Sequence, residues 1–171
     1  MSFIDLAKSR YSVRGFKRTP VEEEKIKKIL EAGKIAPTAK NSQPQKIYVL
    51  KSEEAIEKIN KLSPCIYGAP LVFVIGYDKD RAVSVPARDY YNFGAMDSTI
   101  VATHMILEAT DLGLGSCWVG MFNDVEVQKT FELPDNIQVT ALMPVGYTAD
   151  GVGPAKMHEE CRPDDEMIEY R

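Results

Sequence analysis

The chain has 171 residues, of which 44% are hydrophobic and 27% charged, and its net charge is −4. This composition suits one globular domain with a substantial core, and the negative charge argues against general nucleic-acid binding. The three cysteines (Cys65, Cys117 and Cys161) form no CxxC pair, and the chain has two histidines. Neither a metal site nor a disulfide framework is expected from so few ligands.

The N-terminal region is predicted to hold a short helix over residues 3–8 and an extended segment over residues 10–16. Its first residues lack the basic-then-apolar pattern of a secretory signal, so we expect a cytoplasmic protein. Thr19, Pro20 and Glu22 form a capping-box pattern, with the proline at the first helical position. This pattern predicts that Thr19 is the N-cap of the next helix and that Pro20 is its first residue.

The middle of the chain alternates predicted strands and helices. Residues 46–50 have the character of a strand, residues 53–62 that of a helix, and residues 71–77 that of a buried strand. The apolar run of this last strand is too short to cross a bilayer, which takes about 20 residues. A charged, exposed loop is expected over residues 78–86. Residues from about 90 to 112 predict a helix that is apolar over most of its circumference and therefore buried.

The last third of the chain begins where Gly113 and Gly115 end this central helix. Residues 123–126 have the pattern of a helix start, and residues 139–147 that of a strand. Residues 151–171 are too irregular to pack on their own chain, and we expect them to form an arm that reaches across a partner. Helices and strands mix without a regular βαβ repeat, so the sequence predicts an α+β fold in one domain, 1–171.

The first candidate binding segment contains Arg10, Ser12 and Arg14. Side chains in an extended segment alternate, so these three residues are expected on one face. Two guanidinium groups that flank a hydroxyl form a good phosphate clamp, because arginine binds oxyanions with two hydrogen bonds. An edge strand with charged outward positions is the alternative interpretation.

Two further segments could line a ligand. Residues 37–45 offer amides and hydroxyls that suit the polar edge of a flavin ring, although an ordinary connecting loop has the same composition. Residues 113–120 are small enough for a planar ligand to approach the backbone closely. For that segment alone, a helix end followed by a core strand with a buried Trp118 is the favoured interpretation, and Cys117 is interpreted as a packing residue.

Familiar catalytic motifs are missing from the sequence. It has no GxGxxG after a strand, no P-loop, no HExxH and no GxSxG. If the protein is an enzyme, a cofactor is expected to carry the chemistry.

The segments, in their order along the chain, resemble the FMN-dependent nitroreductase family. The matching stretches are residues 9–16, 36–44, 109–120 and 144–147. The resemblance implies an α+β, nitroreductase-like fold whose central antiparallel or mixed sheet is flanked by helices. It also implies an intertwined homodimer with FMN between the subunits and an arm at residues 151–171 that contacts the partner.

The resemblance also assigns residues to the cofactor. FMN contacts are implied for Arg10, Tyr11, Ser12 and Arg14 of one subunit, for Pro37, Thr38, Ala39, Asn41 and Gln43 of the other, and for Cys117, Trp118, Val119, Gly120 and Arg162. Arg10 would bind the phosphate, and Arg14 would bind near the pyrimidine edge or the phosphate and serve an electrostatic role in catalysis. Arg162 would close over the phosphate. The chain departs from the family where Tyr11 replaces a frequent basic residue and where Arg162 has no basic neighbour.

The implied activity is a ping-pong reaction. NADH or NADPH would reduce the flavin, and a nitroaromatic, quinone or related small acceptor would then take the electrons. The chain is short for the family, which implies an open pocket. The alternatives are a flavin-binding or storage protein without turnover, a reductive dehalogenase-like member of the same fold, or an enzyme that fragments flavin.

Overall fold

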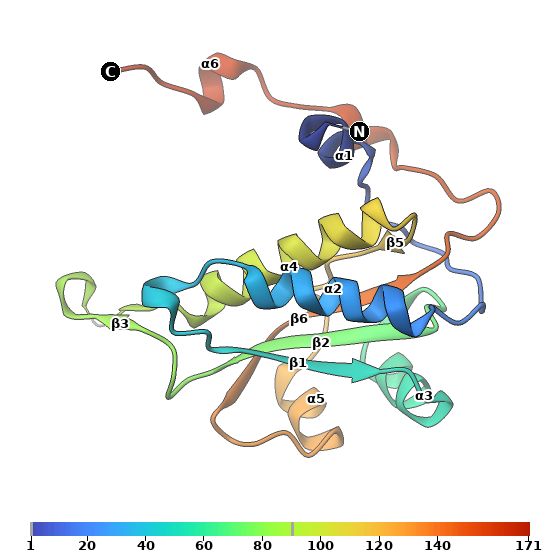
Figure 1. Cartoon of the computed structure of the whole chain (residues 1–171), viewed down its shortest axis with the longest axis horizontal. Helices are drawn as coiled ribbons and strands as arrows, with labels where there is room; N and C mark the ends of the chain where they lie inside the picture. The colour runs from blue at the N-terminus through green and yellow to red at the C-terminus, as the bar shows by residue number, and fades with distance from the viewer. Residues whose placement is uncertain (1, 90) are drawn as a thin grey trace.

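The computed structural model describes residues 2–89 and 91–171. Its main sheet has four strands in the order β1-β2-β6-β5, and every neighbouring pair is antiparallel (Figure 1). The strands are β1 (Gln45–Leu50), β2 (Leu71–Asp78), β5 (Gly115–Ser116) and β6 (Ile137–Gly146). The structure therefore confirms the predicted α+β class, with an antiparallel sheet flanked by helices.

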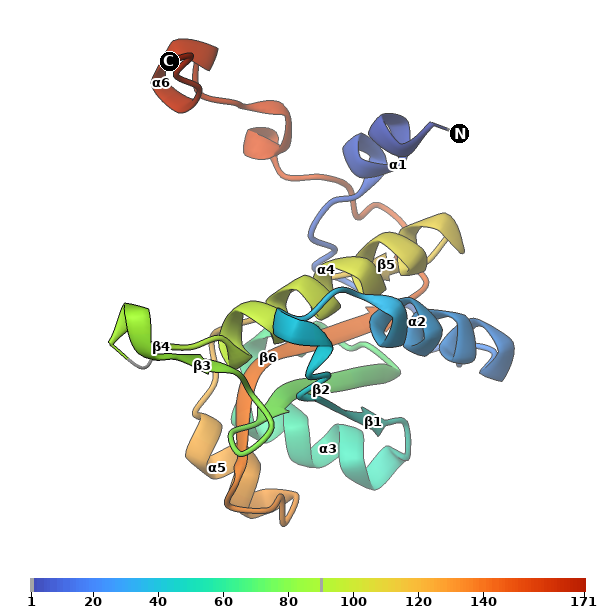
Figure 2. The ribbon, with the colours of Figure 1, turned by 60° about the vertical axis from the view of Figure 1, so that its left-hand side comes forward.

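Helices cover both faces of this sheet. α2 (Glu23–Ile35) and α4 (Gly94–Asp111) lie on one face, and α3 (Glu53–Leu62) and α5 (Asp124–Thr130) lie on the other (Figures 1 and 2). The remaining helical segments are α1 (Phe3–Ser9), α6 (Asp164–Met167), η1 (Ala39–Asn41), η2 (Pro64–Ile66), η3 (Pro86–Arg88) and η4 (Lys156–Glu159).

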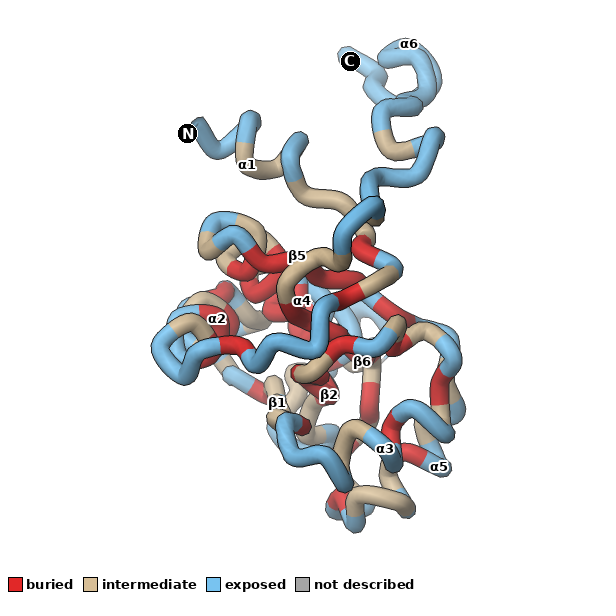
Figure 3. The backbone as a smooth tube through the Cα atoms, turned by 90° about the vertical axis from the view of Figure 1, so that its right-hand side faces the viewer, coloured by how far each residue is buried: buried red, intermediate tan, exposed pale blue. Residues whose placement is uncertain are grey.

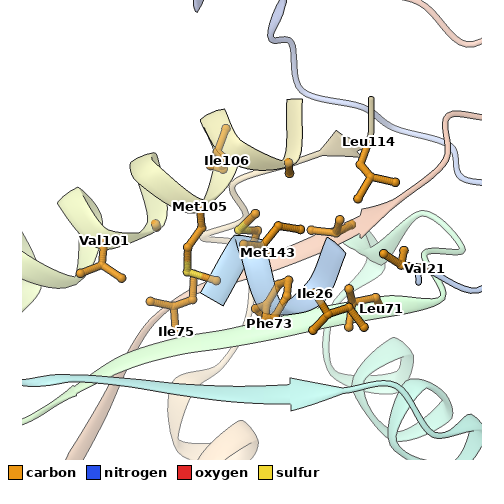
Figure 4. Packing of buried hydrophobic residues seen from close by; sticks show 14 of the residues in the cluster. Val21, Ile26, Leu71, Phe73, Ile75, Val101, Met105, Ile106, Leu114 and Met143 are labelled. Atoms are coloured by element: carbon orange, nitrogen blue, oxygen red, sulfur yellow. The ribbon is translucent and has the colours of Figure 1, made fainter. Parts of the chain in front are cut away.

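The first five residues of β2, from Leu71 to Ile75, are all apolar. Phe73 and Ile75 pack with Met105 of α4 in the core between the sheet and α2/α4 (Figure 4). Val72 and Val74 belong to the second core, on the side of α3 and α5. Since successive side chains of a strand point to opposite faces, burial on both faces requires apolar residues at every position.

The start of α2 differs from the prediction. α2 begins at Glu23, Glu22 takes the N-cap position without a side-chain capping bond, and Thr19 and Pro20 lie outside the helix. The Glu22 carboxylate instead accepts hydrogen bonds of 2.7 and 2.8 Å from the Tyr147 hydroxyl. The capping-box prediction was therefore wrong, because the Glu22 side chain binds Tyr147, which is distant in the sequence, and does not cap the helix.

α4 begins later than predicted, at Gly94. Tyr90, the first residue of the predicted helix, lies outside the described residues. β3 (Ser84–Val85), inside the expected charged loop, pairs with β4 (Tyr91–Asn92), inside the predicted helix, and the two short strands project from the body (Figure 2). Glycine is required at position 94, the first residue of α4, because a Cβ there would lie 2.0 Å from the Tyr77 ring.

α4 is buried on one face. Val101 and Met105 have no exposed surface, whereas Met96 and Ile100, on the outward face, are 45% and 37% exposed. The expectation of a buried helix therefore holds for the face of α4 that packs on the sheet, whereas the described residues of the same chain leave Met96 and Ile100 exposed on the other face.

Both ends of the chain stand away from the sheet. α1 has no buried residues, and residues 159–171 are exposed throughout (Figure 3). The arm is held near its base, where His158 Nε2 lies 3.1 Å from the Lys8 carbonyl oxygen. No helix among the described residues is long and apolar enough to cross a membrane.

Candidate functional site

The segment that carries Arg10, Ser12 and Arg14 lies against β5. The Val13 N–H donates a hydrogen bond of 2.9 Å to the Ser116 carbonyl oxygen, and Ser12 pairs with Ser116 in a parallel bridge. Val13 is buried, while the two arginines and Ser12 remain at least partly exposed. This alternation is expected of an extended segment and leaves the three polar side chains available to a ligand.

Cys117 follows β5 and lies beside the same segment. Burial raises the pKa of the Cys117 thiol, while a hydrogen bond with Ser12 and the charges of Arg14 and Arg10 oppose this rise. The thiol therefore lies within electrostatic range of both guanidinium groups. Cys117 is also part of the second hydrophobic core, which agrees with its interpretation as a packing residue.

The sequence did not single out Tyr67 and Cys65, which lie near Arg14. The pKa of the Tyr67 hydroxyl is raised by its hydrogen bond with the Cys65 thiol and by burial, and a hydrogen bond from Arg14 opposes this rise. Tyr67 follows η2 with a left-handed φ of 55°. Its neighbour Gly68 is a turn signal in the sequence, but a turn signal does not indicate which distant segment the turn will contact.

The second half of the expected site, the polar loop after α2, lies against the N-terminal part of α4. Lys40, Asn41 and Gln43 have left-handed φ values of 50°, 53° and 48°. The Ala39 N–H donates a hydrogen bond of 2.9 Å to Oδ1 of Asp97, a buried residue of α4. The sequence pattern does not mark Asp97 as functional, because acidic residues are common near the start of a helix for electrostatic reasons alone.

The residues from Cys117 to Gly120 are alternately buried and exposed. Val119 is buried and pairs with Leu142, whereas Trp118 is 42% exposed. A Cβ at Gly120 would lie 3.1 Å from the Trp118 ring. The interpretation of Trp118 as a buried core residue was wrong, because Cys117 and Val119 occupy the inward positions of this extended stretch.

The expected FMN contacts do not all come together within one chain. The loop lies near Asp97 and the arginine segment near β5, so about 20 Å of α4 separates the two. The exposed members of the set are Arg14, Pro37, Asn41, Gln43, Trp118, Gly120 and Arg162, and the partly buried ones are Arg10, Tyr11, Ser12, Thr38 and Ala39. Arg162 belongs to the arm that leaves the body of the chain (Figure 3).

Each half contains a buried hydroxyl without a hydrogen-bond partner among the described residues. These hydroxyls belong to Ser116 beside the arginine segment and to Ser42 in the loop. A buried polar atom without a partner is costly, so such atoms often mark places where a bound group supplies one. The donor and acceptor groups of both halves therefore fit a ligand that has a phosphate and a polar ring edge.

A cavity of about 880 Å³ lies elsewhere, between the N-terminal part of α2 and α3. Arg18, Glu23, Lys51, Glu53 and Asn60 are among its lining residues, and none of the expected FMN contacts lines it. Its position gives no reason to move the candidate site from β5.

Comparison with known proteins gives concordant matches. The family model described as the Nitroreductase family matches residues 7–65 and 60–147. A crystal structure of a nitroreductase family protein from Clostridium difficile 630 has a TM-score of 0.93 and 38% identity, and the match covers 99% of this chain and 98% of that one.

Two further relatives carry more specific names. A structure named an FMN-dependent nitroreductase, from Clostridium difficile R20291, is 26% identical with a TM-score of 0.78, and the match covers 98% of each chain. An NADPH-dependent oxidoreductase of Staphylococcus aureus (strain USA300) is 34% identical over 162 residues, which are 85% of this chain. The chain spans 64% of that relative's length.

Proposed function

The chain belongs to the nitroreductase family, and we propose that it is an FMN-dependent NAD(P)H oxidoreductase that reduces nitroaromatic, quinone or related small acceptors by a ping-pong hydride mechanism. In this proposal, residues 1–171 form one FMN-binding domain. The names of relatives support the electron donor and the cofactor, since one is an NADPH-dependent oxidoreductase and another an FMN-dependent nitroreductase.

The observation that carries the proposal is the meeting of the arginine segment with β5. Arg10, Ser12 and Arg14 remain accessible beside a buried strand end, where the Ser116 hydroxyl has no partner among the described residues. Gly115 permits this approach, because a Cβ there would lie 2.6 Å from Cγ2 of Val13. The guanidinium groups, the hydroxyls and the nearby backbone of β5 together suit a ligand that has a phosphate and an adjoining polar group.

In the proposed site, Arg10 holds the phosphate of FMN, and Arg14 places positive charge near the pyrimidine edge of the ring. Ser12, Cys117 and Val119 form the backbone-lined wall, and Trp118 lies at the rim. When bound, FMN supplies the ability to take a hydride from NADH or NADPH and to pass electrons to an acceptor. The protein orients the reactants and provides the electrostatic surroundings, and solvent supplies protons in an open pocket.

We further propose that the site is shared between two subunits. Arg14 and the loop are both expected at the pyrimidine edge, yet about 20 Å of α4 separates them within one chain. A partner that presents its own loop to this arginine segment would complete the site. The exposed apolar side chains of Met96 and Ile100 on α4, and of Phe3 and Ile4 on α1, support burial by a second copy.

The proposal is tested first by the absorbance spectrum of the purified protein, followed by anaerobic addition of NADH or NADPH. Bands near about 370 and 450 nm that bleach on addition are expected of a flavin reductase. Turnover with nitroaromatics and quinones, compared with halogenated phenols, would separate the proposed activity from dehalogenation. A protein that takes up no FMN from solution, or that holds FMN and does not oxidise NAD(P)H, would refute it.

A variant tests the assignment of the phosphate. Arg10→Ala is expected to weaken FMN binding by about 1–3 kcal/mol, the usual loss for a charge-assisted contact. FMN affinity equal to that of the wild type would remove Arg10 from the phosphate site. Light scattering should give the mass of a dimer, and a stable, flavin-loaded monomer would contradict the shared site.

A further inference from the structure

Asp97 is a buried acidic residue whose carboxyl group accepts one hydrogen bond among the described residues. The side chain is 3% exposed, and its Oδ1 accepts the hydrogen bond of 2.9 Å from the Ala39 N–H. Its Oδ2 is buried without a partner among the described residues. Burying a carboxyl group with one oxygen unpaired costs free energy. The hydrogen bond to Ala39 is therefore the contact that could explain why an acidic residue stands at this position.

The loop that Asp97 contacts has an uncommon backbone. Lys40, Asn41 and Gln43 all have left-handed φ values, which asparagine tolerates but which are unfavourable for lysine and glutamine. Such a conformation persists only where its surroundings impose it. The loop therefore depends on the hydrogen bonds that hold it.

Most of those hydrogen bonds are internal to the loop. The Asn41 N–H donates to the Thr38 carbonyl oxygen, the Ser42 N–H to the Ala39 carbonyl oxygen, and the Gln43 N–H to Oγ1 of Thr38. Among the described residues, the bond from Ala39 to Asp97 is the one hydrogen bond that ties residues 38–43 to the body of the chain.

We infer that Asp97 is a positioning residue that fixes the Thr38–Gln43 loop on α4 in the shape that receives the flavin of the partner subunit. Asp97 acts through the Ala39 amide and does not itself touch the cofactor. The inference rests on the proposed function for the role of the loop, whereas the anchoring of the loop is a property of the chain alone.

The test compares two substitutions of Asp97 with a matched control. Asp97→Ala removes the acceptor, and Asp97→Asn keeps an oxygen that can accept from Ala39. Ser98→Ala is the control, because Ser98 is the adjacent fully buried polar residue and its hydroxyl pairs with Thr140 of the sheet, at 2.9 Å, instead of with the loop.

Two readouts separate positioning from general stability. FMN binding to the apoprotein is measured by quenching of flavin fluorescence, and exchange of the Ala39 amide hydrogen is measured by NMR. Asp97→Ala should raise the Kd for FMN about tenfold and accelerate Ala39 exchange, in line with the loss of one hydrogen bond. Asp97→Asn should restore both to within about threefold of the wild type, and Ser98→Ala should leave both unchanged even where it lowers the Tm.

The inference is overturned if Asp97→Ala binds FMN and protects Ala39 as the wild type does. It is equally overturned if Ser98→Ala raises the Kd as much as Asp97→Ala, because the effect would then be one of core stability. If Asp97→Ala does not fold, Ala39→Pro removes the donor from the loop side. Proline suits the first position of η1, and the extended backbone of Thr38 accommodates a following proline.

Ala39→Pro should also raise the Kd, and wild-type affinity in that variant would contradict the inference. If the wild-type protein itself binds no FMN, the proposed function fails. Faster Ala39 exchange in Asp97→Ala, with no change in Ser98→Ala, would then still establish the anchoring. Unchanged exchange would show that the anchoring fails as well.

Discussion

Gly115 is the position where a single methyl group should disturb the packing of the arginine segment on β5. A Cβ built there lies 2.6 Å from Cγ2 of Val13 and 2.9 Å from Oγ1 of Thr148. Carbon atoms in contact prefer separations of about 3.5–4.0 Å, so Val13 would have to move by about 1 Å. Val13 is 1% exposed, and its N–H bonds to Ser116, so the movement would strain both the core and this pairing.

Gly115→Ala is therefore expected to lower the free energy of unfolding by about 1–3 kcal/mol, the usual cost of overpacking. For a chain of this length the fall in Tm would be about 2–12 °C. Gly153→Ala is the matched control, because a Cβ at Gly153 meets nothing within 4 Å. The control also corrects for the loss of unfolded-state entropy that any substitution of glycine by alanine produces.

Thermal unfolding followed by circular dichroism, without flavin, measures this effect. Titration of the two variants with FMN then shows whether displacement of the arginine segment also weakens binding, as we expect for Gly115→Ala. Equal Tm values for Gly115→Ala and Gly153→Ala would refute the reasoning, since the segment would then be able to move away from β5 without cost.

Three further outcomes are expected. A thiol reagent should label exposed Cys161 rapidly and buried Cys117, whose thiol pKa is raised, only slowly, and mass spectrometry of partly labelled protein would reveal the opposite order if it occurred. The Tyr147 hydroxyl lowers the pKa of the Glu22 carboxyl below its ordinary 4.5, so this contact stabilises the fold above that pH and loses its effect as the pH falls. The Tm difference between the wild type and Tyr147→Phe should accordingly be larger at about pH 7 than at about pH 3, and an equal difference at both would count against the contact. Ile100→Glu places a charge on the exposed apolar face of α4 and should shift the protein from dimer to monomer in light scattering, whereas an unchanged mass would place the interface elsewhere.

The elements with strong local signals could be predicted from the sequence. Residues 71–75 are apolar at every position because β2 is covered on both faces, and residues 53–62 have a helical pattern that the structure confirms as α3. Asn123 was predicted to begin a helix, and its side chain accepts from the Glu126 N–H. Such signals depend on neighbouring residues alone.

The errors arose where a distant contact outweighed a local pattern. Glu22 does not close the predicted capping box, because its carboxylate binds Tyr147. Trp118 lies at the surface because Cys117 and Val119 take the inward positions of the extended stretch after β5. In both cases the sequence contains the residue, but the partner or the face is set by the tertiary structure.

By itself, the sequence determined the α+β class, the order of most elements and the family, because periodicity, turn residues and an ordered set of short motifs are properties of the linear chain. Only the tertiary structure decided that Tyr67 meets Arg14, that Asp97 holds the loop, and that α4 keeps that loop about 20 Å from the arginine segment. These relations depend on how helices and strands pack against one another. Residues far apart in the chain become neighbours through that packing, and the sequence around each residue does not indicate which distant residue it will contact.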